Sequence, residues 1–176
     1  MRPGQRSTGN VAESRYHMQI GLPGEAVISA RDRVTTSETE VAAFLAEART
    51  LNVATLGPGG AIHIVAMWFV MRGPSPVFWT YAKSQKARNL SRDARLSALV
   101  EAGESYGTLR GAELIGMAEL VTDPVQVLRI GEELSTKYEG LGYDGDLRRA
   151  AAKRIGVILN PARTISWDHR KLTAAR

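Results

Sequence analysis

The clearest alternation of apolar and polar residues begins near residue 41, where apolar side chains recur three or four positions apart. The apolar positions are Val41, Phe44, Leu45 and Ala48, which would share one face of a helix. Just before them, Ser37 and Glu40 have the spacing of a capping box, in which each side chain bonds the backbone N–H of the other residue. The pattern therefore predicts an amphipathic helix that starts after Ser37 and ends near Arg49.

From residue 51 onward the pattern changes to short apolar runs separated by glycine and proline, which is typical of strands. Five runs are expected to be strands: 51–56, 62–70, 77–81, 95–101 and 108–121. The first three are joined by short Gly/Pro turns and predict a meander, and the segment from Gly57 to Gly60 fits a hairpin turn better than a phosphate loop. Gly111 and Gly116 interrupt the fifth run, which suggests a bulge or a corner.

The last third of the chain predicts further helices and two further strands. Asp123 and Pro124 form a strong helix start, and apolar residues follow at helical spacing up to Tyr138. After a glycine-rich loop at 140–145, the sequence predicts a basic helical piece over 147–154 and strands over 155–159 and 164–167. The elements together predict an α+β fold centred on an antiparallel barrel of six or seven strands with peripheral helices.

Composition divides the chain into three parts. Residues 1–36 are rich in Gly, Arg and Ser and have no sustained periodicity, so we expect a flexible N-terminal extension. Residues 37–172 are expected to form one domain, which is long enough to bury a sizeable core. Residues 173–176 would be a C-terminal tail.

Several classes of protein are disfavoured by what the sequence contains. The absence of cysteine excludes disulfide scaffolds and thiolate chemistry, and none of the three histidines has a second ligand at metal-binding spacing, so no metal site is expected. A nucleophile elbow of the form G-x-S-x-G is also lacking. With no signal-peptide block and no apolar run near the roughly 18 residues of a membrane helix, we expect a soluble, cytoplasmic protein with no membrane partner.

The net charge of the chain points to an anionic partner. The formal net charge is +5 and the sequence pI is about 9.8. The basic residues are dispersed, with local groups at 83–95 and 148–154, whereas groove binding to nucleic acid needs a continuous basic surface. A phosphorylated small molecule is therefore the better candidate, and no nucleic-acid partner is expected.

The candidate anion site lies where the strand at 77–81 runs into a polar loop that opens a helix. Ser84 is a plausible N-cap, and a helix N-terminus offers free N–H groups and partial positive charge. Lys83 and Lys86 flank this point, so amides, a hydroxyl and two ammonium groups could bind one phosphate. The alternative is that both lysines are simply solvated. Trp68, Trp79 and Trp167 fit either a core or a binding surface for a flat heterocycle.

At this level of detail the chain from about Glu38 to Leu172 resembles a known family, the flavin and deazaflavin oxidoreductases with a split antiparallel β-barrel, which form the superfamily of pyridoxamine 5′-phosphate oxidase. Within it the sequence is most similar to the actinobacterial branch that binds the deazaflavin coenzyme F-420. The residues that carry this resemblance are the segments 54–60, 66–69, 82–90, 93–97, 108–111 and 166–172.

The resemblance implies a homodimer with a cofactor at the subunit interface. Residues of the strand at 64–69 would run along the flavin-like ring, Arg110 and Gly111 would complete the pocket from the facing subunit, and Trp167 would lie near the ring. The remaining positions implied are before, in or just after the phosphate-binding turn. The full set of implied cofactor-binding residues is Ala66, Met67, Trp68, Trp79, Thr80, Lys83, Ser84, Gln85, Lys86, Asn89, Arg110, Gly111 and Trp167.

Departures from the oxidase pattern favour the deazaflavin branch. The phosphate turn carries Gln85 and Lys86 where the oxidase has an Arg-Lys pair, the strand at 64–69 has no basic residue, and the C-terminus lacks the arginine-rich substrate motif. The resemblance thus implies a coenzyme F-420-dependent reductase that transfers a hydride to an electron-poor small molecule such as a conjugated alkene or enone. The alternatives are an FMN-dependent oxidoreductase and a non-catalytic deazaflavin carrier. Tyr81, His63 and solvent are all candidate proton donors.

Overall fold

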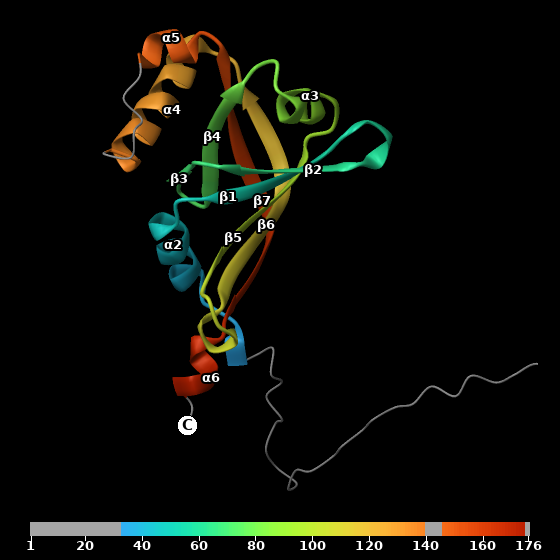
Figure 1. The fold of residues 1–176 in the computed structure, drawn as a ribbon. Coiled ribbons are helices and arrows are strands. Elements are labelled where there is room, and N and C mark those ends of the chain that lie inside the picture. Colours follow the sequence, from blue (N-terminus) through green and yellow to red (C-terminus); the bar gives the residue numbers. More distant parts are fainter. Residues whose placement is uncertain (1–32, 140–145, 175–176) are drawn as a thin grey trace, which may run out of the picture.

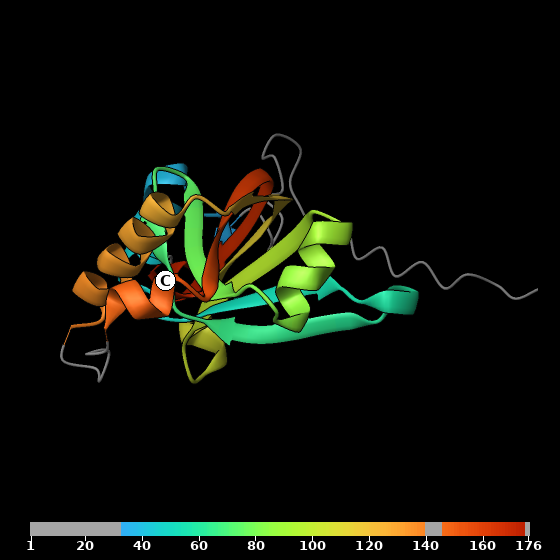
Figure 2. The same ribbon diagram turned by 90° about the horizontal axis from the view of Figure 1, so that it is seen from above.

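Antiparallel strands form one curled sheet in the computed structural model, which describes residues 33–139 and 146–174 (Figures 1 and 2). The described residues contain seven strands in the order β2-β1-β5-β6-β7-β4-β3. Their bounds are β1 Leu51–Leu56, β2 Ile62–Met67, β3 Val70–Arg72, β4 Ser75–Tyr81, β5 Arg95–Ala102, β6 Arg110–Val121 and β7 Arg154–Asp168. The predicted α+β split barrel is confirmed.

Helices lie around the curled sheet, whose interior is filled by buried apolar side chains. Figure 1 shows α4 with α5 at one end of β7 and α6 at the other end, while α3 follows the end of β4. The helices are α2 Glu38–Glu47, α3 Gln85–Arg92, α4 Pro124–Lys137, α5 Leu147–Ala151 and α6 Arg170–Ala174, with short 3-10 turns η1 Pro58–Gly60 and η2 Tyr106–Thr108. No helix among these described residues is both long and apolar enough to cross a membrane.

The predicted helix starts are confirmed. They could be predicted because each depends on residues only a few positions apart. Ser37 and Glu40 form the reciprocal capping box, Ser84 accepts from the N–H of Ala87, and Asp123 accepts from the N–H of Gln126. The observed helix ends differ more from the predicted ones than the helix starts do. α2 ends at Glu47 because Ala48 is already extended, and α5 ends at Ala151, short of the predicted Arg154, because Arg154 pairs with Tyr81 as the first residue of β7.

The expected single strand over 62–70 is wrong, because the chain breaks it into β2 and β3 at Trp68 and Phe69. The Tyr138 hydroxyl donates to the carbonyl of Arg49 (2.7 Å) and accepts from the N–H of Phe69 (3.0 Å). Trp68 stacks on the Tyr138 ring, with centroids 4.4 Å apart. β2 therefore pairs with β1 and β3 with β4, at opposite edges of the sheet, so the three-strand meander is also wrong.

The two strands expected at the end of the chain are one continuous strand. β7 runs the length of β6, and the register shifts between Ile115 and Gly116, where Ala162 is the extra residue. A Cβ on Gly116 would lie 2.0 Å from the carbonyl oxygen of Asn160, so only glycine fits this crossing. The predicted irregularity is confirmed at Gly116, whereas Gly111 pairs regularly with Trp167.

Buried apolar residues form two clusters. The first fills the curled sheet and includes Leu51, Phe69, Phe78 and Leu159. The second lies between α4 and the strands β4 and β7, and it contains Trp79. At the domain's start, the Thr36 hydroxyl bonds Ser166 and the carbonyl of Thr35 accepts from Lys171. Most of the predicted extension (residues 1–32), the 140–145 loop and residues 175–176 lie outside the described residues.

Candidate cofactor-binding site

The turn between β4 and α3 holds three polar side chains against one another. Ser84 Oγ lies 3.1 Å from Thr80 Oγ1 and also caps α3. Lys86, in the first turn of α3, reaches back and donates from Nζ to Thr80 Oγ1 (3.0 Å). Thr80 is buried at the end of β4. The geometry thus brings Ser84 and Lys86 together at the helix start as expected, whereas Lys83 is exposed, and the binding of an anion here stays a prediction.

Lys86 is a half-buried cation without a carboxylate partner in the described parts of the chain. Burial lowers the pKa of Lys86 from its ordinary value of 10.5, because a desolvated ammonium group is less stable than a hydrated one. A bound anion would offset this desolvation, since a buried charge is stabilised when it is paired and hydrogen-bonded. The Lys86 ammonium group is therefore suited to phosphate.

A cavity of about 220 Å³ adjoins this ammonium group. We call it the aromatic–cation pocket. Five of its lining residues were predicted from the sequence, and Tyr81, Leu134 and Arg154 are the others. No carboxylate lines it. The complete lining is Met67, Trp68, Trp79, Thr80, Tyr81, Lys86, Leu134 and Arg154.

Other predicted residues support α3 rather than line this pocket. Asn89 is fully buried, and its amide donates to Thr55 Oγ1 (3.0 Å) while its Oδ1 accepts from Gln85 Nε2 (2.8 Å). This chain of bonds ties α3 to β1 and occupies the Gln85 amide. Lys83 and Ala66 are exposed and do not line the pocket. A cofactor contact stays a prediction for these four residues, as it does for the predicted residues that line the pocket.

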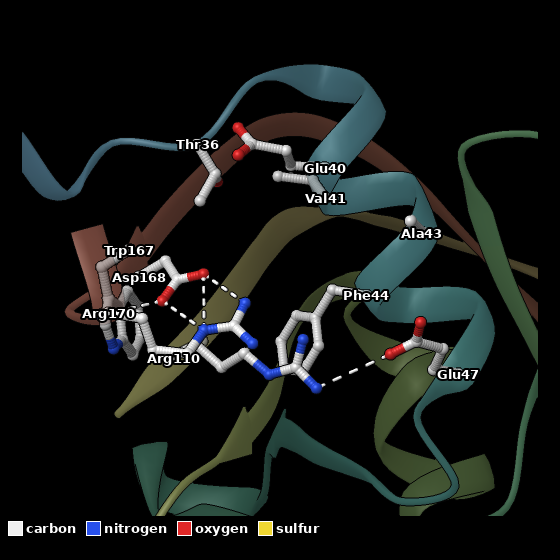
Figure 3. Close-up of a pocket in the computed structure, with 11 residues that line it drawn as sticks. Thr36, Glu40, Val41, Ala43, Phe44, Glu47, Arg110, Trp167, Asp168 and Arg170 are labelled. Carbon is white, nitrogen blue, oxygen red and sulfur yellow. Dashed lines mark hydrogen bonds and ion pairs between the residues drawn. The ribbon is translucent and has the colours of Figure 1, made fainter. Parts of the chain in front are cut away.

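Ser84 caps α3 and lines neither pocket, and the other three predicted residues lie in a second cavity, of about 180 Å³, shown in Figure 3. We call it the ion-pair pocket. Arg110 lies over the Phe44 ring, with Cζ 4.5 Å from the centroid, and is 3.6 Å from a Glu47 oxygen. The ion-pair pocket is lined by Thr36, Glu40, Val41, Ala43, Phe44, Glu47, Arg110, Gly111, Trp167, Asp168 and Arg170.

Carboxylates neutralise the arginines of the ion-pair pocket. Arg170 pairs with Asp168, and hydrogen bonds from the Arg170 side chain, with its charge, lower the pKa of Asp168. The Trp167 indole lies on Gly111, where a Cβ would be 2.2 Å from the ring. Only glycine leaves room for the indole at this position.

The two pockets lie at opposite ends of β7. Trp79 pairs with Gly156 near its start, and Gly111 pairs with Trp167 near its end. These positions are eleven residues apart, which corresponds to roughly 35 Å of extended strand. One chain therefore does not bring the thirteen predicted residues into a single site.

Two residues that the sequence analysis did not name line the aromatic–cation pocket. Leu134 follows from the α4 periodicity only as a core residue, and Arg154 is more than 70 positions from the β4 residues it contacts. Of the two candidate proton-donating side chains, Tyr81 lines the pocket, whereas His63 does not, and its Nδ1 is buried without a hydrogen-bond partner among the described residues. The described residues also contain no cluster of three His, Asp or Glu side chains that could hold a metal ion.

Comparison with solved structures shows which proteins share this fold. The conserved hypothetical protein Rv2991 of Mycobacterium tuberculosis is 41% identical, with 81% of this chain and 91% of that chain covered and a TM-score of 0.75. An F420 reductase is 25% identical, with 70% of this chain and 94% of that chain covered and a TM-score of 0.60. The heme storage protein HutZ of Vibrio cholerae is 18% identical, with 74% and 94% covered and a TM-score of 0.61, which shows the fold alone.

Comparison with protein families gives the wider relationship. A search of curated proteins finds no match to this chain. The family model described as pyridoxamine 5′-phosphate oxidase matches residues 37–168, which is the whole barrel from the cap of α2 to the end of β7. This superfamily includes flavin-binding oxidoreductases. The chain therefore belongs to the pyridoxamine 5′-phosphate oxidase family.

Proposed function

We propose that the protein is a coenzyme F-420-dependent reductase that delivers a hydride to an electron-poor small molecule, such as a conjugated alkene or enone. The observation that carries this proposal is the aromatic–cation pocket, in which Lys86, a half-buried cation with no described carboxylate partner, stands beside aromatic side chains. The similarity to an F420 reductase supports the choice of the deazaflavin.

The residues of the pocket fit a phosphorylated, flat cofactor. Lys86 and Ser84 would hold the phosphate, and Trp68, Trp79 and Met67 offer apolar surface for a ring system. Bound in its reduced form, the deazaflavin supplies the hydride. Trp79 and Leu134 exclude water from one side of the pocket, and Lys86 balances the phosphate charge. The Tyr81 hydroxyl is the side-chain proton donor that we assign, because Tyr81 lines the pocket and is 55% exposed.

The proposal includes a homodimer in which the ion-pair pocket of one subunit approaches the cofactor of the other. Two observations support it. Arg110 and Gly111 are remote from Lys86 within one chain, and apolar side chains are exposed on β2 and β6, with Ile62 68%, Ile64 64% and Met117 51% exposed. The cytoplasmic location and the lack of a nucleic-acid partner stay predictions from the sequence.

The proposed function is tested by binding and turnover together. Purified protein is titrated with coenzyme F-420 and with FMN while tryptophan fluorescence is followed, and we expect quenching by the deazaflavin. Stopped-flow oxidation of the bound, reduced deazaflavin by a panel of enones and quinones should be faster than that of free cofactor. Tight FMN binding without a response to the deazaflavin would support the FMN-dependent alternative, and deazaflavin binding without acceleration would support the carrier.

A further inference from the structure

Arg154 occupies a fixed position over the aromatic wall of the aromatic–cation pocket. It is the first residue of β7 and pairs with Tyr81 of β4. Its Cζ lies 4.3 Å from the Tyr81 ring centroid and 4.7 Å from the Trp79 ring. Nη1 donates to the carbonyl of Ala150 (3.0 Å) at the end of α5. The aromatic rings and this bond together set the direction of the guanidinium group.

Most of the hydrogen-bonding capacity of Arg154 is not used by the described residues. A guanidinium group has five N–H donors, and one of them bonds Ala150. Other arginines here pair with carboxylates, as Arg72 does with Glu133 and Arg170 with Asp168, whereas no described carboxylate pairs with Arg154. Arg154 is thus a second cation of this pocket, after Lys86.

We infer that Arg154 is a cofactor-binding residue that binds the phosphate group of the cofactor together with Lys86. Arginine binds phosphate through two parallel N–H donors, and lysine adds a point charge, so the two side chains make different contacts with one group. This assignment rests on the proposed function for the identity of the cofactor. The binding of an oxyanion between Arg154 and Lys86 does not depend on it.

The competing role for Arg154 is structural, in which its stacking only fastens β7 and α5 to β4. Both roles predict some loss of stability when the side chain is removed. Only the binding role predicts a loss of ligand affinity that depends on whether the ligand carries the phosphate. Ligand pairs with and without this phosphate therefore separate the two. FMN and riboflavin differ by the phosphate alone, whereas coenzyme F-420 and its phosphate-free deazaflavin chromophore differ by the phosphate and the acidic tail attached to it.

The experiment compares Arg154→Ala and Arg154→Gln with wild type, using Arg148→Ala as the matched control. Arg148 is an exposed arginine of α5 that does not line the pocket. Arg154→Gln removes the charge but keeps an amide that can donate to Ala150, so it decides the question if Arg154→Ala does not fold. Dissociation constants for inorganic phosphate and for both ligand pairs are measured by tryptophan fluorescence, and thermal unfolding is followed for each variant.

We expect both Arg154 variants to bind inorganic phosphate and the phosphate-bearing cofactor ~10- to 100-fold more weakly, which corresponds to the loss of a charge-assisted hydrogen bond. Affinity for the phosphate-free partners should change by less than about twofold, as should every constant for Arg148→Ala. A folded Arg154 variant with unchanged constants for phosphate and coenzyme F-420, or with an equal loss for both members of a ligand pair, overturns the assignment. If phosphate binding depends on Arg154 but neither cofactor binds, the proposed function fails and the anion site stands.

Discussion

The two pockets at the ends of β7 are built alike but differ in charge. In each, an indole ring lies against a glycine: Trp79 on Gly131 in the aromatic–cation pocket and Trp167 on Gly111 in the ion-pair pocket. Each pocket also contains two basic side chains. The acidic residues differ. None lines the first pocket, whereas Glu40, Glu47 and Asp168 line the second.

This difference shows that a count of basic residues does not identify an anion site. In the ion-pair pocket an incoming anion must compete with carboxylates that already hold the arginines (Figure 3). In the aromatic–cation pocket an anion would gain a desolvated ammonium group and the unused donors of Arg154 without such competition. The pocket with fewer charged groups is therefore the better anion site.

The largest effect is expected from removal of the Lys86 ammonium group. Lys86→Ala should weaken binding of the phosphate-bearing cofactor by ~1.5–3 kcal/mol, the usual size of a hydrogen bond to a charged group. Folding stability should change little, because the lost bond to Thr80 is offset by the relief of lysine desolvation. Cofactor titration and urea unfolding measure the two quantities, with the exposed Lys153→Ala as control. An unchanged dissociation constant would remove Lys86 from the phosphate site.

The next largest effect is expected when either glycine under an indole ring is replaced by alanine, and it is a loss of folding stability. A Cβ would lie 2.2 Å from the ring at Gly111 and 2.5 Å at Gly131, so alanine at either position forces a ring to move at a cost of about 1–3 kcal/mol. Gly131 is inside α4, where alanine regains ~0.8–1 kcal/mol of helix propensity. Gly111→Ala should therefore lower the free energy of unfolding more than Gly131→Ala does, as measured in urea.

The Gly131 variant has a second readout in cofactor binding. Displacement of Trp79 should weaken binding of both phosphate-bearing and phosphate-free cofactors, because the ring surface is altered and the charges are not. A Gly131→Ala protein that is less stable than Gly111→Ala, or that binds cofactor normally, would contradict the packing described for Trp79.

The two pockets should give pH effects of opposite direction: cofactor affinity at the aromatic–cation pocket should fall as pH rises, and the stability contributed by the ion-pair pocket should fall as pH falls. Burial lowers the pKa of Lys86, so cofactor affinity should fall as pH rises through this depressed pKa, below the ordinary 10.5. In the ion-pair pocket, hydrogen bonds from Lys171 and Ser37 lower the pKa of Glu40 to about 2, and Arg170 lowers that of Asp168. The stability that these carboxylates contribute is complete above their ordinary pKa values and is lost as pH falls through the lowered ones.

Two titrations check these directions. The affinity ratio of FMN to riboflavin, measured between neutral and alkaline pH, should decline for wild type and stay flat for Lys86→Ala. The difference in unfolding free energy between wild type and Asp168→Asn should shrink on the acid side. A ratio that is flat for wild type up to the ordinary pKa of lysine would contradict the desolvation of Lys86.

Local sequence signals predicted much of the fold and part of the site. The caps at Ser37, Ser84 and Asp123 require only neighbouring residues, so they were predicted correctly. The break after Met67 was not, because it depends on a hydroxyl from Tyr138, which is distant in the sequence. The continuity of β7 through Pro161 likewise depends on the bulge opposite Gly116.

The site shows the same division. Thr80, Ser84 and Lys86 lie within seven residues of one another, so their convergence could be predicted from a strand, a cap and one helical turn. Arg154 joins them only through the pairing of β4 with β7, and sequence spacing does not reveal strand pairing between distant segments. The resemblance placed Trp167 beside the ring of the cofactor and Arg110 there from the facing subunit. Within one chain both residues lie at the end of β7 that is remote from Lys86, so their place beside the cofactor stays a prediction.

The smallest effect tests whether the ion-pair pocket can be converted toward the character of the other pocket. Glu47 is largely exposed and lies 3.6 Å from Arg110, so Glu47→Gln should change the free energy of unfolding by less than about 1 kcal/mol. In the proposed homodimer, Arg110 released from Glu47 should favour the cofactor of the facing subunit, and affinity should rise by about twofold, the scale of a weak surface pair. Exposed Glu119→Gln is the control, and Arg110→Ala should abolish the gain. A lower affinity in Glu47→Gln would mean that the Arg110–Glu47 pair itself positions the site, and that the paired arginine is already in its functional arrangement.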